Sequence, residues 1–255
     1  MKSDRLRLHY ETKYANQSEQ PLRSMPSADA LSMPTNRFEA AISFCRNAFN
    51  GESILEIGAG DGCIAAGLLQ AGLPFSHYLA TEASPVRLKS LKQRLDDPRI
   101  STSQFDVENQ DEVLQEKYDM IIMIAVIEHL IDPISAMTRL RDYLTPGGFI
   151  YIDTPNIAKL TRRLKLLCGR FPATASKDEG LMTYEGSVVD LLDEGHLHYF
   201  TYRSLSAMLM RHCGFLRVTS LGYACAPFIF PKRIHHMLAR ACPKLFSEIA
   251  ILAYR

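Results

Sequence analysis

Short runs of apolar and β-branched residues alternate along the chain with longer stretches in which apolar residues recur at helical spacing. From residue 53 onward, the short runs predict strands at 53–57, 77–81, 100–105, 118–124 and 149–153. The stretches between them predict helices at 63–71, 85–95 and 133–144. Strands that alternate with helices are typical of βαβ units, so this pattern predicts an α/β fold with a parallel sheet.

Boundary residues support these helices. Ser84-Pro85 and Asp132-Pro133 each combine an N-cap residue with a proline at the first helical position. Pro146-Gly147-Gly148 predicts the end of the third helix and a turn into the next strand.

The ends of the chain are less regular. We expect a helix at 37–49 before the alternation, and after it a helix at 204–213 that ends at Gly214 and strands at 215–222 and 248–254. Residues 156–200 lack a clear period, which predicts an insertion over the sheet. Residues 1–36 carry turn formers and charges, so we expect an N-terminal lid in front of one domain at 37–255.

Glycines at alternate positions, Gly58, Gly60 and Gly62, follow the first predicted strand and precede a helix. Glycine has no Cβ, so such a turn can take positive φ and bring backbone amides against a ligand. Glu82 ends the second predicted strand, where a carboxylate can accept hydrogen bonds from both hydroxyls of a ribose. Together these features predict a nucleoside-containing cofactor, and a tight turn without a ligand is the alternative.

The glycine spacing distinguishes between cofactors. A dinucleotide pyrophosphate favours G-x-G-x-x-G, but Cys63 stands three residues after Gly60. The observed G-x-G-x-G, preceded by Glu56, suits a ligand without a phosphate at this place. Asp106, at the end of the third predicted strand, can accept a hydrogen bond from an adenine amino group or cap a following helix.

Composition and charge narrow the choice of partners. The formal net charge of +1, with interspersed signs, does not favour a nucleic acid. The six cysteines form no C-x-x-C pair, which predicts reduced thiols and a cytoplasmic location. The polar residues 1–10 do not form an export signal, and the longest apolar run, 120–127, is too short to cross a bilayer.

In their order and spacing, these motifs resemble the class I S-adenosylmethionine-dependent methyltransferases, and among them the branch that includes the ubiquinone-biosynthesis O-methyltransferases. The resemblance covers about residues 37–223. The residues that carry it are Leu55-Glu56-Ile57-Gly58-Ala59-Gly60-Asp61-Gly62, Thr81-Glu82-Ala83-Ser84-Pro85, Tyr118-Asp119-Met120-Ile121, Ile127-Glu128-His129-Leu130-Ile131-Asp132-Pro133, Leu144-Thr145-Pro146-Gly147-Gly148, Thr154-Pro155-Asn156 and Gly195-His196-Leu197-His198-Tyr199-Phe200.

The resemblance implies a doubly wound, Rossmann-like sheet of seven strands, mostly parallel with one antiparallel strand, and helices on both faces. It implies S-adenosyl-L-methionine as cofactor and S-adenosyl-L-homocysteine as product. The implied cofactor-binding residues are Arg37, Glu56, Gly58, Ala59, Gly60, Glu82, Ala83, Asp106, Val107, Ile124 and Ala125. Arg37 is either a partner of the cofactor carboxylate or an exposed helix arginine.

One departure from the family pattern concerns a metal. The ubiquinone-type enzymes carry a glutamate ahead of the Glu-His pair, and this chain has Ala125 at that place. We therefore do not predict a metal site, although His196 and His198 beside Asp193-Glu194 are a weaker pattern for one.

Two histidines are candidate catalytic bases. The sulfonium methyl is already activated, so the enzyme has to align an acceptor and remove its proton. His129 follows the fourth predicted strand, and His196 lies in a polar stretch that the resemblance places over the strand ends. We prefer His196. A structural role for His129 and an ordinary strand edge around His196 are the alternatives.

Two segments combine basic and apolar residues. The first, 227–245, carries Lys232, Arg233, His235, His236 and Arg240. This pattern is typical of a helix on an anionic membrane surface or over an apolar substrate. The second lies in the insertion and carries Arg162, Arg163, Lys165 and Arg170, which are candidates for binding an acidic group of a substrate. Solvated helix faces are the alternative for both.

The sequence thus predicts a small-molecule methyltransferase, with a hydroxyl of a sugar, a quinone or another secondary metabolite as the preferred acceptor. The acceptor is expected under the insertion and the lid. The alternatives are an S-adenosylmethionine-binding protein without turnover and an RNA or protein methyltransferase, and the latter normally shows a basic face or an appended recognition domain. The pattern does not predict an oligomeric state.

Overall fold

The computed structural model describes residues 27–175, 192–225 and 231–255. Its centre is a sheet of seven strands in the order β3-β2-β1-β4-β5-β7-β6. The strands are β1 (Ser53–Ile57), β2 (His77–Glu82), β3 (Ile100–Gln104), β4 (Tyr118–Ile124), β5 (Leu144–Pro155), β6 (Arg217–Leu221) and β7 (Glu248–Tyr254). Strands β1 to β5 pair in parallel, and β7 runs antiparallel to both of its neighbours. The predicted fold class is confirmed.

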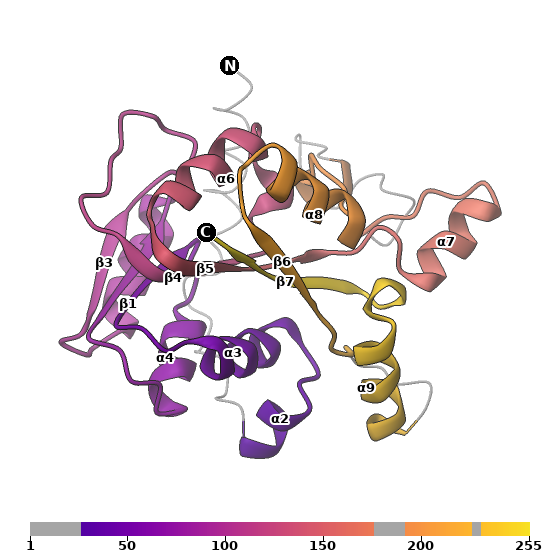
Figure 1. The fold of residues 1–255 in the computed structure, drawn as a ribbon, viewed down its shortest axis with the longest axis horizontal. Coiled ribbons are helices and arrows are strands. Elements are labelled where there is room, and N and C mark those ends of the chain that lie inside the picture. Colours follow the sequence, from indigo (N-terminus) through magenta and orange to yellow (C-terminus); the bar gives the residue numbers. More distant parts are fainter. Residues whose placement is uncertain (1–26, 176–191, 226–230) are drawn as a thin grey trace.

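Helices cover both faces of the sheet (Figure 1). The first face carries α3 (Arg37–Ala48), α4 (Cys63–Gln70) and α5 (Pro85–Arg94), and the second carries α6 (Pro133–Asp142) and α8 (Tyr202–Arg211). Shorter or peripheral elements are α2 (Ala28–Ser32), α7 (Leu160–Leu167), α9 (Lys232–Ala241) and the 3-10 turns η1 (Ile127–His129), η2 (Leu192–Gly195) and η3 (Pro243–Leu245).

Each face of the sheet has its own core because β4 is apolar on both sides. Met120 and Ile122 pack toward α3 and α4, whereas Ile121 and Met123 pack toward α6 and α8. A strand buried on both faces is typical of a parallel sheet between two helical layers. This layering fixes the carboxyl ends of β1, β2, β4 and β5 at one edge, where ligands bind in open α/β sheets.

The predicted helix starts have the expected chemistry. The Oγ of Ser84 accepts from the amide of Arg87, and the Oδ1 of Asp132 accepts from that of Ser135 at 3.0 Å. Gly214 has a φ of 75°, but α8 ends at Arg211 with His212 as its C-cap, so this glycine lies one residue beyond the C′ position that was predicted for it.

The structure differs from the prediction after α6. The predicted turn at Pro146-Gly147-Gly148 lies inside β5, because Leu144 already pairs with Tyr118 and a register shift before Met120 accommodates the extra residues. Within the predicted insertion at 156–200, residues 160–167 form α7 rather than an irregular segment, and residues 176–191 lie outside the described part. The predicted lid at 1–36 also lies outside it as far as residue 26.

Candidate active site

The glycine loop lies at the carboxyl end of β1 and takes the backbone shape that its glycines permit. Gly58, Gly60 and Gly62 have φ values of 70°, 60° and 77°. A Cβ on Gly58 would lie 2.7 Å from Cγ2 of Val126, so the loop after β4 packs directly on this turn. The amide of Ala59 donates to the carbonyl of Thr81 at 2.9 Å, which ties the loop to the end of β2.

Glu82, at the end of β2, is hydrogen-bonded to the glycine loop. Its Oε2 accepts from the amide of Gly60 at 3.1 Å, and the side chain is buried. The Nη1 of Arg87, from the first turn of α5, lies 3.5 Å from the same oxygen. This arginine was not predicted as a site residue, although its place three residues after the cap at Ser84 turns it toward this strand end. Ala83 follows Glu82 directly, and its carbonyl accepts a bond from Gln104.

Glu56 lies inside the sheet, below the glycine loop. Its Oε2 accepts from the hydroxyl of Tyr78 at 2.6 Å. Burial raises the pKa of Glu56 to about 8, although the bond from Tyr78 acts in the opposite direction. This buried carboxyl therefore bonds to the neighbouring strand β2 in this structure, and contact with a cofactor stays a prediction.

The predicted adenine-binding pair lies after β3. The Oδ1 of Asp106 accepts from the amide of Glu108 at 2.9 Å, so this exposed carboxylate stabilises a turn. Val107 is buried, and its carbonyl accepts from Arg139 at 3.0 Å. No described helix begins at Asp106, so the alternative of a helix cap is wrong, and the adenine contact remains a prediction.

The end of β4 turns sharply toward the site. Ala125, after Ile124, has a φ of 52°, a left-handed conformation that is uncommon for a residue with a Cβ. Its amide donates to the carbonyl of Asp153 at 2.9 Å, which holds the turn against β5. The 3-10 turn η1 follows at once and carries Glu128 and His129.

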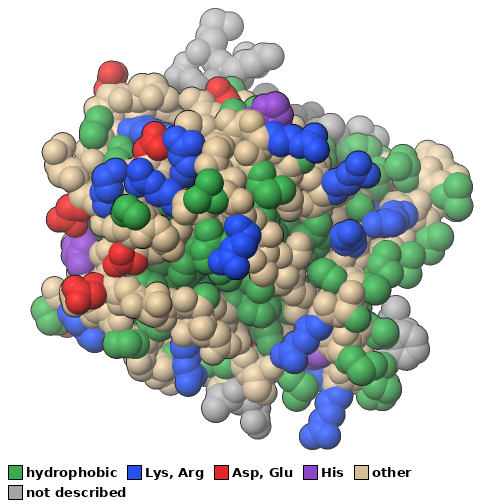
Figure 2. All heavy atoms as spheres, viewed as in Figure 1, with side chains coloured by type: hydrophobic (Ala, Val, Ile, Leu, Met, Phe, Trp, Pro, Cys, Tyr) green, Lys and Arg blue, Asp and Glu red, His purple; other side chains and the backbone are tan. Residues whose placement is uncertain are grey.

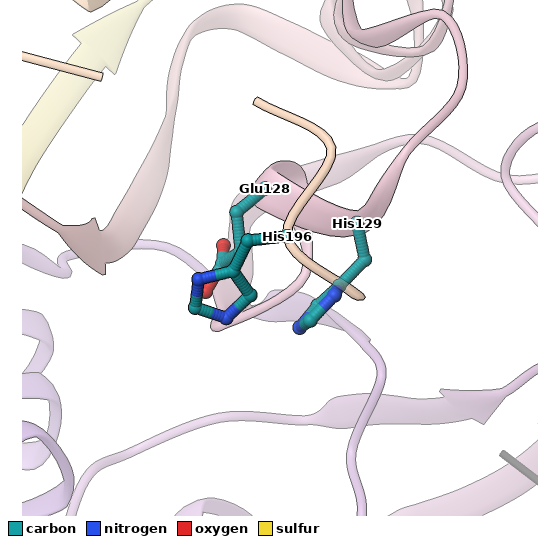
Figure 3. A group of neighbouring side chains, drawn as sticks. All are labelled: Glu128, His129 and His196. Atoms are coloured by element: carbon teal, nitrogen blue, oxygen red, sulfur yellow. The ribbon is translucent and has the colours of Figure 1, made fainter. Parts of the chain in front are cut away.

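Glu128, His129 and His196 meet at this edge, and their ligand-type atoms all lie within 4.8 Å of one another (Figure 3). The rings of His129 and His196 have their centroids 4.7 Å apart. Oε2 of Glu128 accepts from the hydroxyl of Thr154 at 2.9 Å, and Oε1 is buried without a hydrogen-bond partner among the described residues. Burial raises the pKa of Glu128 to about 7, and Arg37 acts to lower it.

Thr174 and Asp193 form a hydrogen-bonded chain to Nδ1 of His196. Thr174 Oγ1 lies 2.5 Å from Oδ2 of Asp193 and 2.6 Å from Nδ1 of His196. Asp193 is fully buried, has a φ of 48°, and also accepts from the amides of Thr174 and Ala175 at 2.6 and 2.8 Å. Thr174 was not predicted, because no sequence pattern links it to a histidine 22 residues away.

Arg37 lies near the cluster but has protein partners of its own. Its Nη2 is 2.9 Å from Oε2 of Glu248 on β7, and its Nε is 3.8 Å from Oδ1 of the buried Asp153 on β5. Burial raises the pKa of Asp153, and Arg37 opposes that effect. A further role toward a cofactor carboxylate stays a prediction.

The structure therefore brings the glycine loop, Glu82, the turn at Ala125 and the histidine pair to one edge of the sheet. Two hollows of about 300 and 520 Å³ lie elsewhere, beside α6, and both are lined in part by Arg139 and Asp142. They share no residue with this edge, so we define the site by its side chains. Two histidines and a carboxylate can bind a divalent cation or transfer a proton.

Comparison with known proteins identifies the family. Residues 33–219 match the family described as methyltransferase domain. A ubiquinone biosynthesis O-methyltransferase from Dinoroseobacter shibae is 34% identical over 113 residues, which are 43% of this chain and 44% of that protein. The matched stretch thus spans less than half the length of this relative.

Solved structures share the fold. An S-adenosylmethionine-dependent methyltransferase from Mesorhizobium loti superposes with a TM-score of 0.55 at 15% identity, covering 85% of this chain and 98% of the other. The magnesium protoporphyrin IX methyltransferase of Synechocystis PCC 6803, solved with bound S-adenosylhomocysteine, gives 0.52 at 13% identity, with 86% and 81% covered. Since the family match spans well over half of the chain, this protein belongs to the methyltransferase domain family, as its motifs predict.

Proposed function

We propose that this enzyme transfers the methyl group of S-adenosylmethionine to a hydroxyl of a small organic acceptor, a sugar, a quinone or another secondary metabolite, with His196 as the base. The observation that carries the proposal is the hydrogen bonding of the histidine pair at the edge of the sheet. Both imidazoles are held through Nδ1 by oxygen atoms, which fixes their tautomers.

S-adenosylmethionine is the cofactor of this family of enzymes, and it supplies an electrophilic methyl carbon on a positively charged sulfur. The residues at the loop fit it. Gly58 and Gly60 keep the turn free of Cβ atoms in left-handed backbone, so amides can approach a ligand closely. The position of Glu82 at the end of β2 supports the proposal, because a carboxylate at this strand end can accept from ribose hydroxyls.

The tautomers of His129 and His196 follow from the hydrogen-bond partners of their Nδ1 atoms. Nδ1 of His129 faces the carbonyl of Gly195 at 3.1 Å, and a carbonyl only accepts, so this nitrogen carries the proton. The hydroxyl of Thr174 has one proton, which it donates to the Asp193 carboxylate, so it accepts from Nδ1 of His196. In each neutral ring Nε2 then holds the lone pair.

The proposed step is a direct displacement. Nε2 of His196 takes the proton of the acceptor hydroxyl while the oxygen bonds to the methyl carbon and the carbon–sulfur bond breaks. The products are the methyl ether and S-adenosylhomocysteine, and the proton rests on His196. The buried Asp193 carboxylate, acting through Thr174, stabilises the imidazolium that forms.

The test measures S-adenosylhomocysteine release with a panel of sugars, hydroxybenzoates and isoprenoid quinols. With the best acceptor, His196→Asn is expected to lower kcat about 100-fold or more while cofactor affinity is retained. His198→Asn is the matched control, because the His198 ring lies tilted beside that of Phe200, with centroids 6.2 Å apart, and His198 is not among the three residues of the cluster.

The same assay separates the alternatives. Release with no member of the panel, together with tight cofactor binding, would favour a binding protein without turnover. S-adenosylhomocysteine release that depends on added RNA or protein would favour an RNA or protein methyltransferase. Equal rates for H196N and the wild type would remove His196 from the mechanism.

A further inference from the structure

Helix α7 exposes its apolar side chains. Leu160, Leu164, Leu166 and Leu167 are exposed by 49, 54, 64 and 82%. No residue of this helix is buried. It is held instead at its base, where the guanidinium of Arg162 donates to the carbonyls of Asn156 and Thr174 at 2.7 and 2.9 Å. A helix anchored by polar bonds and covered with exposed leucines presents an apolar surface that is not packed against the described part of the chain.

Helix α9 also exposes apolar side chains. Ile234, Met237 and Leu238 are exposed by 44, 62 and 38%. His236 and Ala239 on its other side are buried against the protein. Thus α9 lies on the body of the molecule with one face and leaves a second apolar face outward.

The two helices belong to one surface. The guanidinium of Arg163 on α7 donates to the carbonyl of Lys244, in the turn η3 that follows α9, at 3.3 Å. The side-chain amide of Asn156 donates to the same carbonyl at 3.1 Å. Figure 1 shows α7 and α9 projecting on the same side, and Figure 2 shows basic and hydrophobic side chains together along that margin.

This surface is strongly basic in a nearly neutral protein. Residues 156–175 and 231–247 contain no Asp or Glu. Their basic residues are Lys159, Arg162, Arg163, Lys165, Arg170, Lys232, Arg233, Arg240 and Lys244. The chain as a whole has a formal net charge of +1, so the rest of it carries the compensating acids.

We propose that the surface formed by α7, η3 and α9 docks this enzyme on an anionic phospholipid bilayer. Leucine and methionine side chains enter the interface, and the cations beside them attract acidic headgroups. A second copy of the chain fits less well, because a symmetric contact would place these cations against the same cations, and residues 156–175 and 231–247 offer no carboxylate to separate them. The described helices include none long and apolar enough to cross a bilayer, so docking is peripheral.

The docking surface also borders the candidate site. Asn156 directly follows β5, whose carboxyl end carries Thr154, the hydrogen-bond donor to Glu128. Arg162 connects α7 to Thr174, which bonds His196. A bilayer on this side would therefore lie next to the candidate site. Docking itself does not depend on the proposed methyl transfer.

The test is flotation of the full chain with vesicles of phosphatidylcholine alone or with one third phosphatidylglycerol. The bound fraction is expected to rise about tenfold with the anionic lipid and to fall in high salt. Leu164→Glu/Leu167→Glu/Met237→Glu should abolish binding. Leu216→Glu is the matched control, since Leu216 is 80% exposed and precedes β6, at the end of β6 and β7 away from α9.

Thermal unfolding and gel filtration of each variant accompany the flotation. The proposal is overturned if the triple variant is folded and floats like the wild type, or if anionic vesicles bind neither protein. It is also overturned if the wild type is a dimer that the triple variant converts to a monomer, which would assign the surface to a second copy.

Discussion

At the scale of single residues, backbone conformation decides whether the cofactor loop can form. Gly58 and Gly72 have nearly equal φ values of 70° and 71°. A Cβ on Gly58 would meet Val126, whereas a Cβ on Gly72 would have no atom within 4 Å. A left-handed residue with a Cβ costs roughly 1–2 kcal/mol in either place. Substitution of Gly72 therefore measures backbone strain alone, whereas substitution of Gly58 measures the strain together with the contact with Val126.

Gly58→Ala is therefore expected to weaken S-adenosylmethionine binding about tenfold or more and to lower stability more than Gly72→Ala does. Isothermal titration and thermal unfolding measure the two effects. Equal affinities of G58A and G72A would contradict the placement of the cofactor at this loop.

The buried Glu56 predicts a pH dependence of stability. Its pKa of about 8 in the folded protein lies above the ordinary value of 4.5. Its contribution is therefore complete below pH 4.5 and is lost as the pH rises toward 8. Between pH 5 and 8, Tm should fall more steeply for the wild type than for Glu56→Gln, which keeps an acceptor for Tyr78. Parallel curves would show that Glu56 ionises at its ordinary pH.

The histidine cluster predicts a response to metal. If His129 and His196 work through their Nε2 lone pairs, chelation with EDTA should leave the rate unchanged. Excess Zn²⁺ should inhibit, because imidazole nitrogens bind it with high affinity. His129→Asn should weaken that inhibition. Loss of activity in EDTA with recovery on adding a cation would instead establish a resident metal.

At the scale of elements, Arg37 ties α3 to two strands of the sheet. Its side chain is 24% exposed, that of Glu248 is 13% exposed, and that of Asp153 is fully buried. Loss of the guanidinium would leave two carboxylates together at low solvent access, which is more costly than loss of a surface pair.

Arg37→Met is expected to lower the free energy of unfolding by roughly 1–3 kcal/mol, less than for a fully buried pair because of its partial exposure. Arg46→Met, on the exposed side of the same helix, is the control and should change little. Chemical denaturation measures both. An unchanged R37M would show that the ion pairs do not stabilise the fold.

The elements that could be predicted from the sequence are those with local signals. Ser84-Pro85 and Asp132-Pro133 start α5 and α6 as expected. Helix α7 was not predicted, although Leu160, Leu164 and Leu167 recur at helical spacing, because residues 156–200 as a whole show no clear period. The start of β5 was placed too late, since its proline and glycines resemble a turn and only pairing with Tyr118 shows a strand.

At the scale of the whole molecule, the site could be predicted only in part. Gly58, Gly60 and Glu82 meet because strand ends of a parallel sheet share an edge. The contact of Arg87 with Glu82 depends on how α5 packs, and that of Thr174 with His196 depends on how two distant segments meet. Contacts of this kind have no local sequence signal.

Ligand binding should stabilise the whole molecule. A ligand at about 100 times its dissociation constant adds roughly 2.7 kcal/mol. For a chain of this size, Tm should rise by about 5–11 °C with S-adenosylmethionine or S-adenosylhomocysteine. NAD and ATP at the same concentration serve as controls. A rise with NAD alone would be incompatible with the cofactor of the proposed reaction.

The bonds from Asp193 to Thr174 and Ala175 have a consequence for how this enzyme can diversify. They join the chain on either side of residues 176–191, and the bond from Thr174 to His196 lies outside that segment. Doubling the length of a segment with fixed ends costs only about 0.6 kcal/mol in closure entropy. In the proposed mechanism, the length of this connection can therefore change while the base keeps its position.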